Sequence, residues 1–240
     1  MAWLVQTPAS LILPGSVTLV SAKLNSSPTY LDENSLAEFS ALNQLELPAS
    51  LNRSVLKRRA DYAAGRYCAQ AALKLAGHKD LVEIGSREDR SPVWPTGWGG
   101  SITHTEGYSC AAVARVSDIR GLGIDSEKLF SDELTEEVRS KVLVASELEY
   151  FSRSIGSALS FSRYVSIVFA AKEGLFKALN PLTGTYFEMN HAELIAIDLE
   201  SGTVRWRLLK ELSKEFVAGK EGQAFFCLDA AYVHAGVVIV

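Results

Sequence analysis

The segment FAAKEGLFKAL, residues 169–179, places charged side chains on a helix whose remaining residues are mostly apolar. Its phenylalanines and leucines can form one buried stripe, whereas Glu173 and Lys177 share another face with Lys172 beside them. A surface ion pair would explain this spacing too, because an i,i+4 pair is common and worth only about 0.2–0.5 kcal/mol. A glutamate between two lysines also suits phosphoryl chemistry, in which a carboxylate holds metal or takes a proton and cations neutralise phosphate.

A second candidate is GLGIDSEKL, residues 121–129, in which Asp125 and Glu127 lie two positions apart. In an extended segment both side chains project from the same side. Two neighbouring carboxylates repel unless a cation lies between them, and hard oxygen ligands suit Mg²⁺. An exposed acidic turn after a buried strand is the alternative for a D-x-E motif on its own. Together, however, the two motifs predict a metal and phosphate site.

A basic segment could supply further phosphate contacts. Residues 53–90 contain nine Arg or Lys against five Asp or Glu, although the whole chain has a formal net charge of -4. Within KRRADYAAGR, either Arg58 or Arg59 lies about two helical turns before Arg66, so two guanidinium groups could face one phosphate. A solvated helix face is the alternative, and the acidic total favours a small polyanion over nucleic acid as the ligand.

The glycine-containing segment GGSITHTEGY, residues 99–108, is expected to be a loop that lets the backbone approach a ligand. Ser101, Thr103 and His104 could donate hydrogen bonds to phosphate there. A purely structural histidine is the competing interpretation.

These residues require helices and strands to position them. A long helix is predicted over residues 50–77, with Ser50 as a possible N-cap and Gly77 at its end. Proline and glycine predict a loop over residues 88–100, and the Arg120-Gly121 junction suggests a hairpin. That hairpin would join strands at 108–117 and 122–125.

The second half shows helical periodicity followed by short β-rich runs. Two helices are predicted at 134–151 and 163–179, the second ending at Asn180-Pro181. Strands are expected within 193–199, 203–209, 224–229 and 234–240, so the order is mixed α+β.

Composition bounds the class of protein. The chain has 240 residues of which 48% are hydrophobic, enough for one large or two small packed domains. The three cysteines are widely spaced and form no CxxC, so neither a disulfide framework nor a zinc site is indicated. A signal peptide would need a positively charged N-terminal region, but no Lys or Arg precedes Lys23. No run approaches the roughly 20 apolar residues of a membrane span. We therefore expect a cytoplasmic protein that binds neither membrane nor nucleic acid.

Four segments taken in order resemble a known family. They are RRADYAAGRYCAQAAL, DRSPVWPTGWGGSITH, GIDSEKL and FAAKEGLFKAL, within roughly residues 50–190. The chain resembles the Sfp-type 4'-phosphopantetheinyl transferases, in the branch of enterobactin synthetase component D and the pseudomonad transferase of primary metabolism. The ordered D-x-E and K-E-x-x-x-K elements are the most specific marks, and the arginine helix and P-x-W-P loop indicate the branch.

The resemblance implies transfer of phosphopantetheine from coenzyme A to a serine of acyl or peptidyl carrier proteins. These partners belong to fatty acid, polyketide or nonribosomal peptide synthases, and adenosine 3',5'-bisphosphate is released. Asp125, Glu127 and Glu173 would hold Mg²⁺ on the pyrophosphate. Glu173 would also be the base for the serine proton, and Lys177 would neutralise phosphate charge.

The resemblance further assigns coenzyme A contacts. Arg58, or Arg59 in its place, would grip phosphates together with Arg66 and His104. Thr103 would be a lesser contact, and Arg87 or Arg90 would lie near the nucleotide end. The cofactor-binding set is completed by Lys172, Lys177, Asp125 and Glu173.

The implied fold is α+β, with two similar α+β subdomains related by pseudo-twofold symmetry in a monomer. Residues 1–120 would carry the basic helix and loop, and residues 121–240 the Mg²⁺ site and catalytic helix. The chain departs from the commonest family pattern at Gly174, where Ser or Ala is usual, and at the variable site Ser126. A further acid near the metal could be Glu147 or Glu149, and the sequence does not choose between them.

Two other functions fit the same residue types. One is a Mg²⁺-dependent pyrophosphohydrolase of coenzyme A or a related nucleotide, although the helix motif R-E-x-x-E-E of the commonest such enzymes is missing from the sequence. The other is a non-catalytic module that binds coenzyme A or a carrier protein, which would not need three convergent carboxylates.

Overall fold

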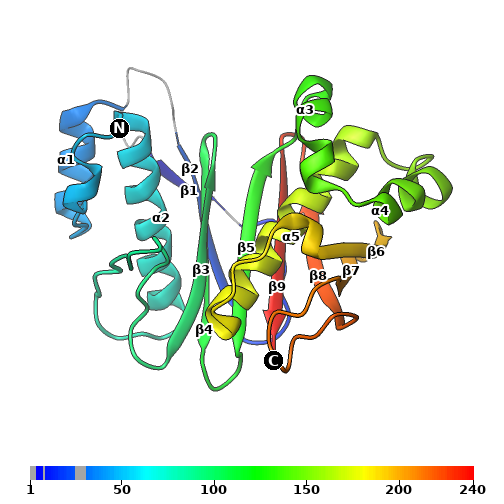
Figure 1. Ribbon diagram of the computed structural model, residues 1–240. Helices are drawn as coiled ribbons and strands as arrows, with labels where there is room; N and C mark the ends of the chain where they lie inside the picture. The colour runs from blue at the N-terminus through cyan, green and yellow to red at the C-terminus, as the bar shows by residue number, and fades with distance from the viewer. Residues whose placement is uncertain (1–3, 8, 25–30) are drawn as a thin grey trace. The chain divides into compact units, whose positions relative to one another are not determined.

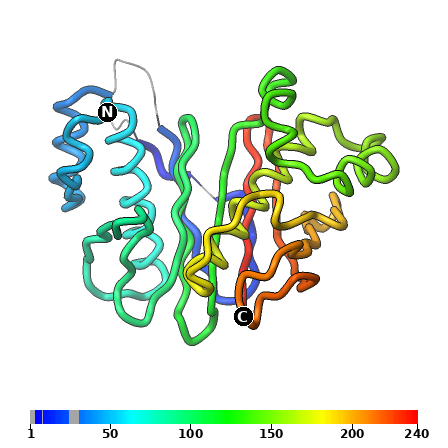
Figure 2. Tube along the Cα trace, in the orientation of Figure 1, coloured from blue at the N-terminus to red at the C-terminus, as the bar shows by residue number. Residues whose placement is uncertain are grey.

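The computed structural model describes residues 4–7, 9–24 and 31–240, which form two compact units (Figure 1). The first unit contains Gly15–Ile119 and the segment before Ser10, and the second contains Arg120–Val240 and Ser10–Pro14. Figure 2 follows the same trace along the chain. Each unit has its own sheet, helices and hydrophobic core, so the mixed α+β class is confirmed.

The first unit is built on a four-stranded antiparallel sheet in the order β1-β2-β4-β3. Its strands are β1 (Leu4–Thr7), β2 (Thr18–Leu24), β3 (Trp98–Thr105) and β4 (Tyr108–Arg115). The helices are α1 (Glu33–Leu42) and α2 (Leu56–Leu75), preceded by the short 3-10 helix η1 (Ala49–Leu51). α2 packs on β4 and β2 through a face of small residues, including Ala60, Ala64 and Ala72, which are fully buried.

Helix α2 starts six residues later than the sequence predicts. Ser50 lies in η1, and the N-cap of α2 is Val55, whose side chain makes no capping hydrogen bond. The end is close to the prediction, because Gly77 follows α2 with a φ of +92°, a left-handed conformation that glycine adopts most readily. The buried Leu51 accounts for the irregular start, since η1 turns this side chain into the protein.

The expected loop at residues 99–108 is wrong. Trp98–Thr105 forms strand β3, and a tight turn at Glu106-Gly107 leads into β4, with Thr105 paired to Tyr108. Gly107 has a φ of +74° at the second position of this two-residue turn, a left-handed conformation that glycine adopts most readily. The glycines therefore lie within a strand, where Gly100 gives the indole of Trp94 room to pack.

The second unit contains a five-stranded antiparallel sheet in the order β5-β9-β8-β7-β6. Its strands are β5 (Gly121–Lys128), β6 (Ala192–Asp198), β7 (Thr203–Leu208), β8 (Glu221–Leu228) and β9 (Tyr232–Ile239). The four C-terminal strands agree with the prediction. The predicted hairpin at Arg120-Gly121 is wrong, because β5 pairs with β9 whereas β4 belongs to the other sheet.

The helices of this unit are α3 (Asp132–Val142), α4 (Ala145–Tyr150) and α5 (Phe161–Thr183), with the π-helical turn η2 (Phe151–Ile155) and the 3-10 helix η3 (Met189–His191). The single helix predicted over 134–151 is thus broken after Val142. α5 continues through Pro181, where the sequence predicted its end, and stops at Gly184 with a φ of +62°. Pro181 thus lies in the last turn of α5, and the helix closes after it with the Gly184 amide donating to the carbonyl of Asn180.

Cys68 and Cys227 are free thiols in this structure. No helix in the described ranges is both long enough and apolar enough to cross a membrane.

Cys227 should be a slow nucleophile at neutral pH. Burial, reinforced by the nearby Asp229, raises the pKa of its thiol to about 11 from an ordinary value of 9.0. Because the thiolate is the reactive form, we expect alkylation by iodoacetamide at pH 8 to be about 100-fold slower than for an ordinary thiol. The rate should rise about tenfold for each pH unit up to pH 11. Peptide mass spectrometry measures this rate, and fast labelling at pH 8 would contradict the pKa shift.

Candidate functional site

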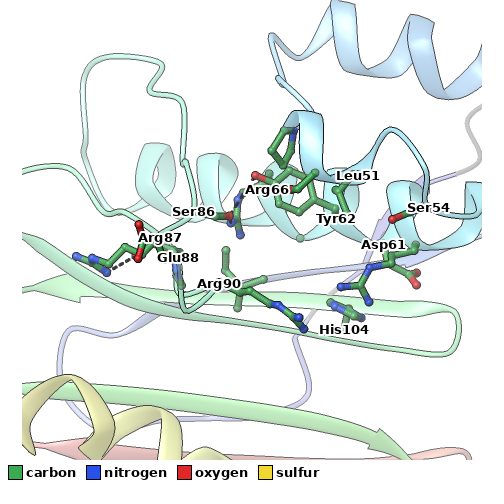
Figure 3. A pocket seen from close by; sticks show the side chains of 16 residues that line it. Leu51, Ser54, Asp61, Tyr62, Arg66, Ser86, Arg87, Glu88, Arg90 and His104 are labelled. Atoms are coloured by element: carbon green, nitrogen blue, oxygen red, sulfur yellow. Dashed lines mark hydrogen bonds between the residues drawn. The ribbon is translucent and has the colours of Figure 1, made fainter. Parts of the chain in front are cut away.

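A cavity of about 730 Å³ opens in the first unit, beside α2 and β3 (Figure 3). Five residues predicted to bind the cofactor line it, namely Arg58, Arg66, Arg87, Arg90 and His104. Its other polar side chains come from Ser50, Ser54, Asp61, Tyr62, Ser86 and Glu88. Four guanidinium groups around one cavity make it a site for an anionic ligand.

Arg66 is held in place by contacts from two directions. One terminal nitrogen donates to the Oγ of Ser86 at 2.7 Å and to the carbonyl of Gly85 at 3.2 Å. Its guanidinium also lies over the ring of Tyr62, 4.5 Å from the ring centre. Only 7% of Arg66 is exposed, so the charge is fixed at the cavity wall before any ligand arrives.

The structure distinguishes between Arg58 and Arg59. Arg58 lines the cavity, whereas Arg59 forms an ion pair with Glu33 of α1. Arg87 donates to the carbonyl of Pro92 at 2.9 Å, inside a loop closed by a bridge between Ser86 and Pro92.

Thr103 does not share the cavity with His104. Successive side chains of a strand point to opposite faces, and His104 lines the cavity together with Ile102. Thr103 and Ser101 are buried on the other face of β3, with 3% and 5% exposure. The geometry therefore gives no support to Thr103 as a cofactor contact in the cavity.

In the second unit, α5 lies directly on β5 because two strand residues lack side chains. A Cβ atom added to Gly123 would lie 2.0 Å from the carbonyl oxygen of Gly174, and one added to Gly121 would lie 2.6 Å from that of Ala178. Asp125 follows on the same face of β5. The close approach brings Lys177 of α5 to Asp125, with Nζ 2.6 Å from Oδ1.

Glu173 completes a group of charges with Asp125 and Lys177. Burial raises the pKa of the Glu173 carboxyl, the Asp125 charge raises it further, and Lys177 opposes the shift. Lys177 also donates to the carbonyl of Ile124 at 3.1 Å. Two carboxyl groups and one ammonium thus interact at the face of β5.

The two glycines at this contact should respond oppositely to alanine. Gly123→Ala must push α5 away from β5, because the new methyl meets backbone atoms that cannot give way, and we expect several kcal/mol of destabilisation. Gly174→Ala meets its nearest atom at 3.5 Å, so the higher helix propensity of alanine should stabilise the protein by about 1 kcal/mol. Urea unfolding of both variants measures the difference. Equal effects would mean that the close approach at Gly123 is not real.

Glu127 lies two residues after Asp125 on β5 and is partly buried. Among residues 4–7, 9–24 and 31–240, no three His, Cys, Asp or Glu side chains group closely enough to hold a metal. The predicted trio of Asp125, Glu127 and Glu173 is therefore not assembled as a coordination shell. Asp125 and Glu173 fit a hard cation by charge and by chemistry, and the Lys177 ammonium lies beside Asp125 in the structure.

Lys172 faces away from this group. It is 1% exposed, and its Nζ donates to the carbonyl of Val142 and to Oε2 of Glu147, both at 2.8 Å. Burial lowers the pKa of Lys172 and raises that of Glu147, and the charge of each partner opposes the other's shift. The structure therefore places Lys172 in an internal ion pair, with no polar contact to the acids at β5.

Neither further acid joins the group at β5. Glu147 is fully buried and accepts the amides of Val144 and Leu194 at 2.8 Å each, in addition to Lys172. Glu149 is exposed and pairs with Arg153 at 3.5 Å. Glu147 therefore connects α4, α5 and β6.

A second cavity, of about 700 Å³, borders Glu173. Its wall combines apolar and polar side chains of α3, α5 and the segment after α5. The apolar ones are Val138, Val142, Phe169, Phe176, Tyr186, Phe187 and Met189, and the polar or charged ones besides Glu173 are Ser140, Lys141, Lys172, Glu188 and Asn190.

Sequence reasoning missed several residues of these sites. Arg66 is held by Tyr62 and Ser86, and no local sequence signal separates these two from ordinary surface residues. The sequence signal for Asp61 is weak: it is an acid between arginines in RRADYAAGR. The cavity that borders Glu173 was also missed, since its wall is assembled from segments far apart in the sequence.

Comparison with known proteins supplies the family. A family model described as the 4'-phosphopantetheinyl transferase N-terminal domain matches residues 47–114, and one described as the 4'-phosphopantetheinyl transferase superfamily matches residues 121–235. The first match contains α2 and most of the arginine cavity, and the second contains both β5 and α5.

Curated relatives agree with the family models. The chain is 38% identical to the 4'-phosphopantetheinyl transferase Svp of Streptomyces mobaraensis over 68% of this chain and 65% of the relative. It is 38% identical to the 4'-phosphopantetheinyl transferase Npt of Nocardia iowensis over 63% and 64%, respectively. It is 36% identical to the enterobactin synthase component D of Escherichia coli K12 over 59% and 66%. Each match spans slightly less than two thirds of the relative's own length.

The two family models follow one another along the chain, and both cover segments whose geometry is described above. The relatives include the enterobactin branch that the sequence motifs indicated. The chain belongs to the 4'-phosphopantetheinyl transferase superfamily.

Proposed function

We propose that this protein transfers the 4'-phosphopantetheine group of coenzyme A to a serine hydroxyl of acyl or peptidyl carrier proteins. The observation that carries the proposal is the convergence of Glu173, Asp125 and Lys177 where α5 lies on β5. Such a group offers a base, a partner for a cation and a positive charge for phosphate. The names of the relatives support the same reaction.

In the proposed step, the Glu173 carboxylate accepts the proton of the carrier serine as its oxygen attacks phosphorus. A serine O–P bond forms, the bridging P–O bond of the pyrophosphate breaks, and adenosine 3',5'-bisphosphate leaves with the electron pair. Lys177 stabilises the negative charge that develops on the phosphate oxygens. Burial holds Glu173 in a poorly solvated position, which raises its basicity above that of an exposed glutamate.

Mg²⁺ is part of the proposal. Asp125 and Glu173 would hold the ion, with Glu127 the nearest further carboxylate along β5, and the ion would neutralise the pyrophosphate. Lys177 bonds Oδ1 of Asp125 in the structure, and a carboxylate can accept from an ammonium with one oxygen while its other oxygen holds a cation.

Coenzyme A carries anionic phosphate groups on its nucleotide, as the first-unit cavity with Arg58, Arg66, Arg87, Arg90 and His104 requires. We propose this cavity as the nucleotide subsite of a cytoplasmic monomer that serves fatty acid, polyketide or nonribosomal peptide synthases.

The test is intact-mass spectrometry of a purified apo-carrier protein incubated with this protein, coenzyme A and Mg²⁺. We expect a mass gain of one phosphopantetheine group, lost with EDTA and with a carrier whose serine is replaced by alanine. Consumption of coenzyme A without a gain on several carriers would instead indicate the pyrophosphohydrolase. Neither gain nor consumption would leave a binding module as the function.

A further inference from the structure

Asp61 is an acid in the wall of a cavity otherwise rich in arginines. It lies on α2, one turn after Arg58 and about one turn before Arg66, and only 6% of it is exposed. Figure 3 places it at the opposite end of the pocket from Arg87. A carboxylate is the wrong charge for gripping phosphate, so it needs another explanation.

Its hydrogen bonding is incomplete. Oδ2 lies 3.4 Å from the Nζ of Lys57, an i,i+4 neighbour whose side chain is 58% exposed. Oδ1 is buried and has no hydrogen-bond partner among residues 4–7, 9–24 and 31–240. Lys57 is also the only cation of those residues within ion-pair distance of Asp61, although the same cavity contains four arginines.

A helix-surface ion pair does not account for this arrangement. Such pairs contribute little, and the lysine-before-acid order found here is the weaker of the two orders. A buried acceptor without a partner is costly, more so when it is charged. A hydrogen-bond donor that enters the cavity, either a water molecule or a group of a ligand, can supply the missing partner of Oδ1.

We propose that Asp61 is a specificity-determining residue that accepts a hydrogen bond from a neutral donor on the nucleoside part of the ligand. This inference rests on the proposed function, in which adenosine 3',5'-bisphosphate is the nucleotide portion. That molecule offers two such donors, the ribose 2'-hydroxyl and the adenine 6-amino group. The arginines bind the phosphates, and Asp61 accepts a hydrogen bond from the nucleoside to which the phosphates are attached. The negative charge of Asp61 also disfavours binding of any additional anionic group at this position.

The test is isothermal titration of the full chain with three probes: adenosine 3',5'-bisphosphate, its 2'-deoxy analogue and inosine 3',5'-bisphosphate. The wild-type protein should bind one analogue about 10- to 100-fold more weakly than the parent, because a hydrogen bond to a charged group is lost. If the 2'-deoxy analogue binds more weakly than the parent, the ribose hydroxyl is the donor. If inosine 3',5'-bisphosphate binds more weakly, the adenine amino group is the donor.

Asp61→Ala should bind the parent and the discriminated analogue equally. The nearly isosteric Asp61→Asn keeps Oδ1 as an acceptor and should retain part of the preference, which guards against a folding defect in the alanine variant. Lys57→Met is the matched control, since it removes the ion pair but should keep the full preference.

Discrimination that survives unchanged in Asp61→Ala would overturn the proposal, as would equal binding of all three probes by the wild-type protein. In both cases the nucleotide site itself would stand. Absence of binding by any probe to the wild-type protein would overturn the nucleotide site on which the proposal rests.

Discussion

Glu173→Gln should abolish transfer, lowering kcat by about 10³-fold or more, while adenosine 3',5'-bisphosphate still binds with an affinity within about twofold of wild type. A glutamine cannot take the serine proton, and general-base catalysis is typically worth about 10²–10⁴-fold. The cations of the first unit that would hold the nucleotide remain. Steady-state transfer to a carrier protein and isothermal titration measure the two quantities.

Folding should not explain this loss. Glu173 interacts unfavourably with the Asp125 charge and is partly desolvated, so a neutral side chain of the same shape should leave the midpoint of thermal unfolding unchanged or raise it. Glu149→Gln provides the matched control, because Glu149 is an exposed helical glutamate paired with Arg153 and should keep full activity. Turnover by Glu173→Gln at the wild-type rate would exclude Glu173 as the base.

The parts of the site that sequence could predict are those whose geometry is local. That Glu173 and Lys177 lie on the same side of α5 follows from helical periodicity, and the orientation of Asp125 follows from strand alternation. Their meeting depends on β5 and α5 being in contact, which Gly121 and Gly123 permit. The glycine pattern GLG is visible in the sequence, but only the structure shows that these glycines let α5 pack closely against β5.

The failures are those in which a distant segment decides the outcome. Strand β5 could have paired with β4 by proximity along the chain, yet its partner is β9, more than a hundred residues later. The strand containing His104 looked like a glycine loop, because the sequence does not show that Gly100 makes room for Trp94. Arg58 and Arg59 could not be separated until Glu33 of α1 was known to bind the second of them.

Lys172 is the clearest case, and it carries the second large effect. Motif spacing placed it beside Glu173 as a phosphate ligand, whereas the structure buries it against Glu147 from a different helix. Lys172→Met should therefore lower the free energy of unfolding by about 3–5 kcal/mol, since Glu147 would remain charged and buried without its cation. Urea unfolding of the variant measures this loss.

Substituting Glu147 as well shows whether the loss of stability comes from the Glu147 charge that Lys172→Met leaves buried without a partner. In Lys172→Met/Glu147→Gln no buried charge remains, and the glutamine carbonyl can still accept the Leu194 amide, so most of the lost stability should return. Lys141→Met, at an exposed position of α3, should change stability by less than about 0.5 kcal/mol. If Lys172→Met instead kept its stability and lost coenzyme A affinity, the motif-based assignment would be right and the buried pair wrong. Because the pair joins α5 to α4 and β6, its loss weakens the packing of the helix that also carries Glu173.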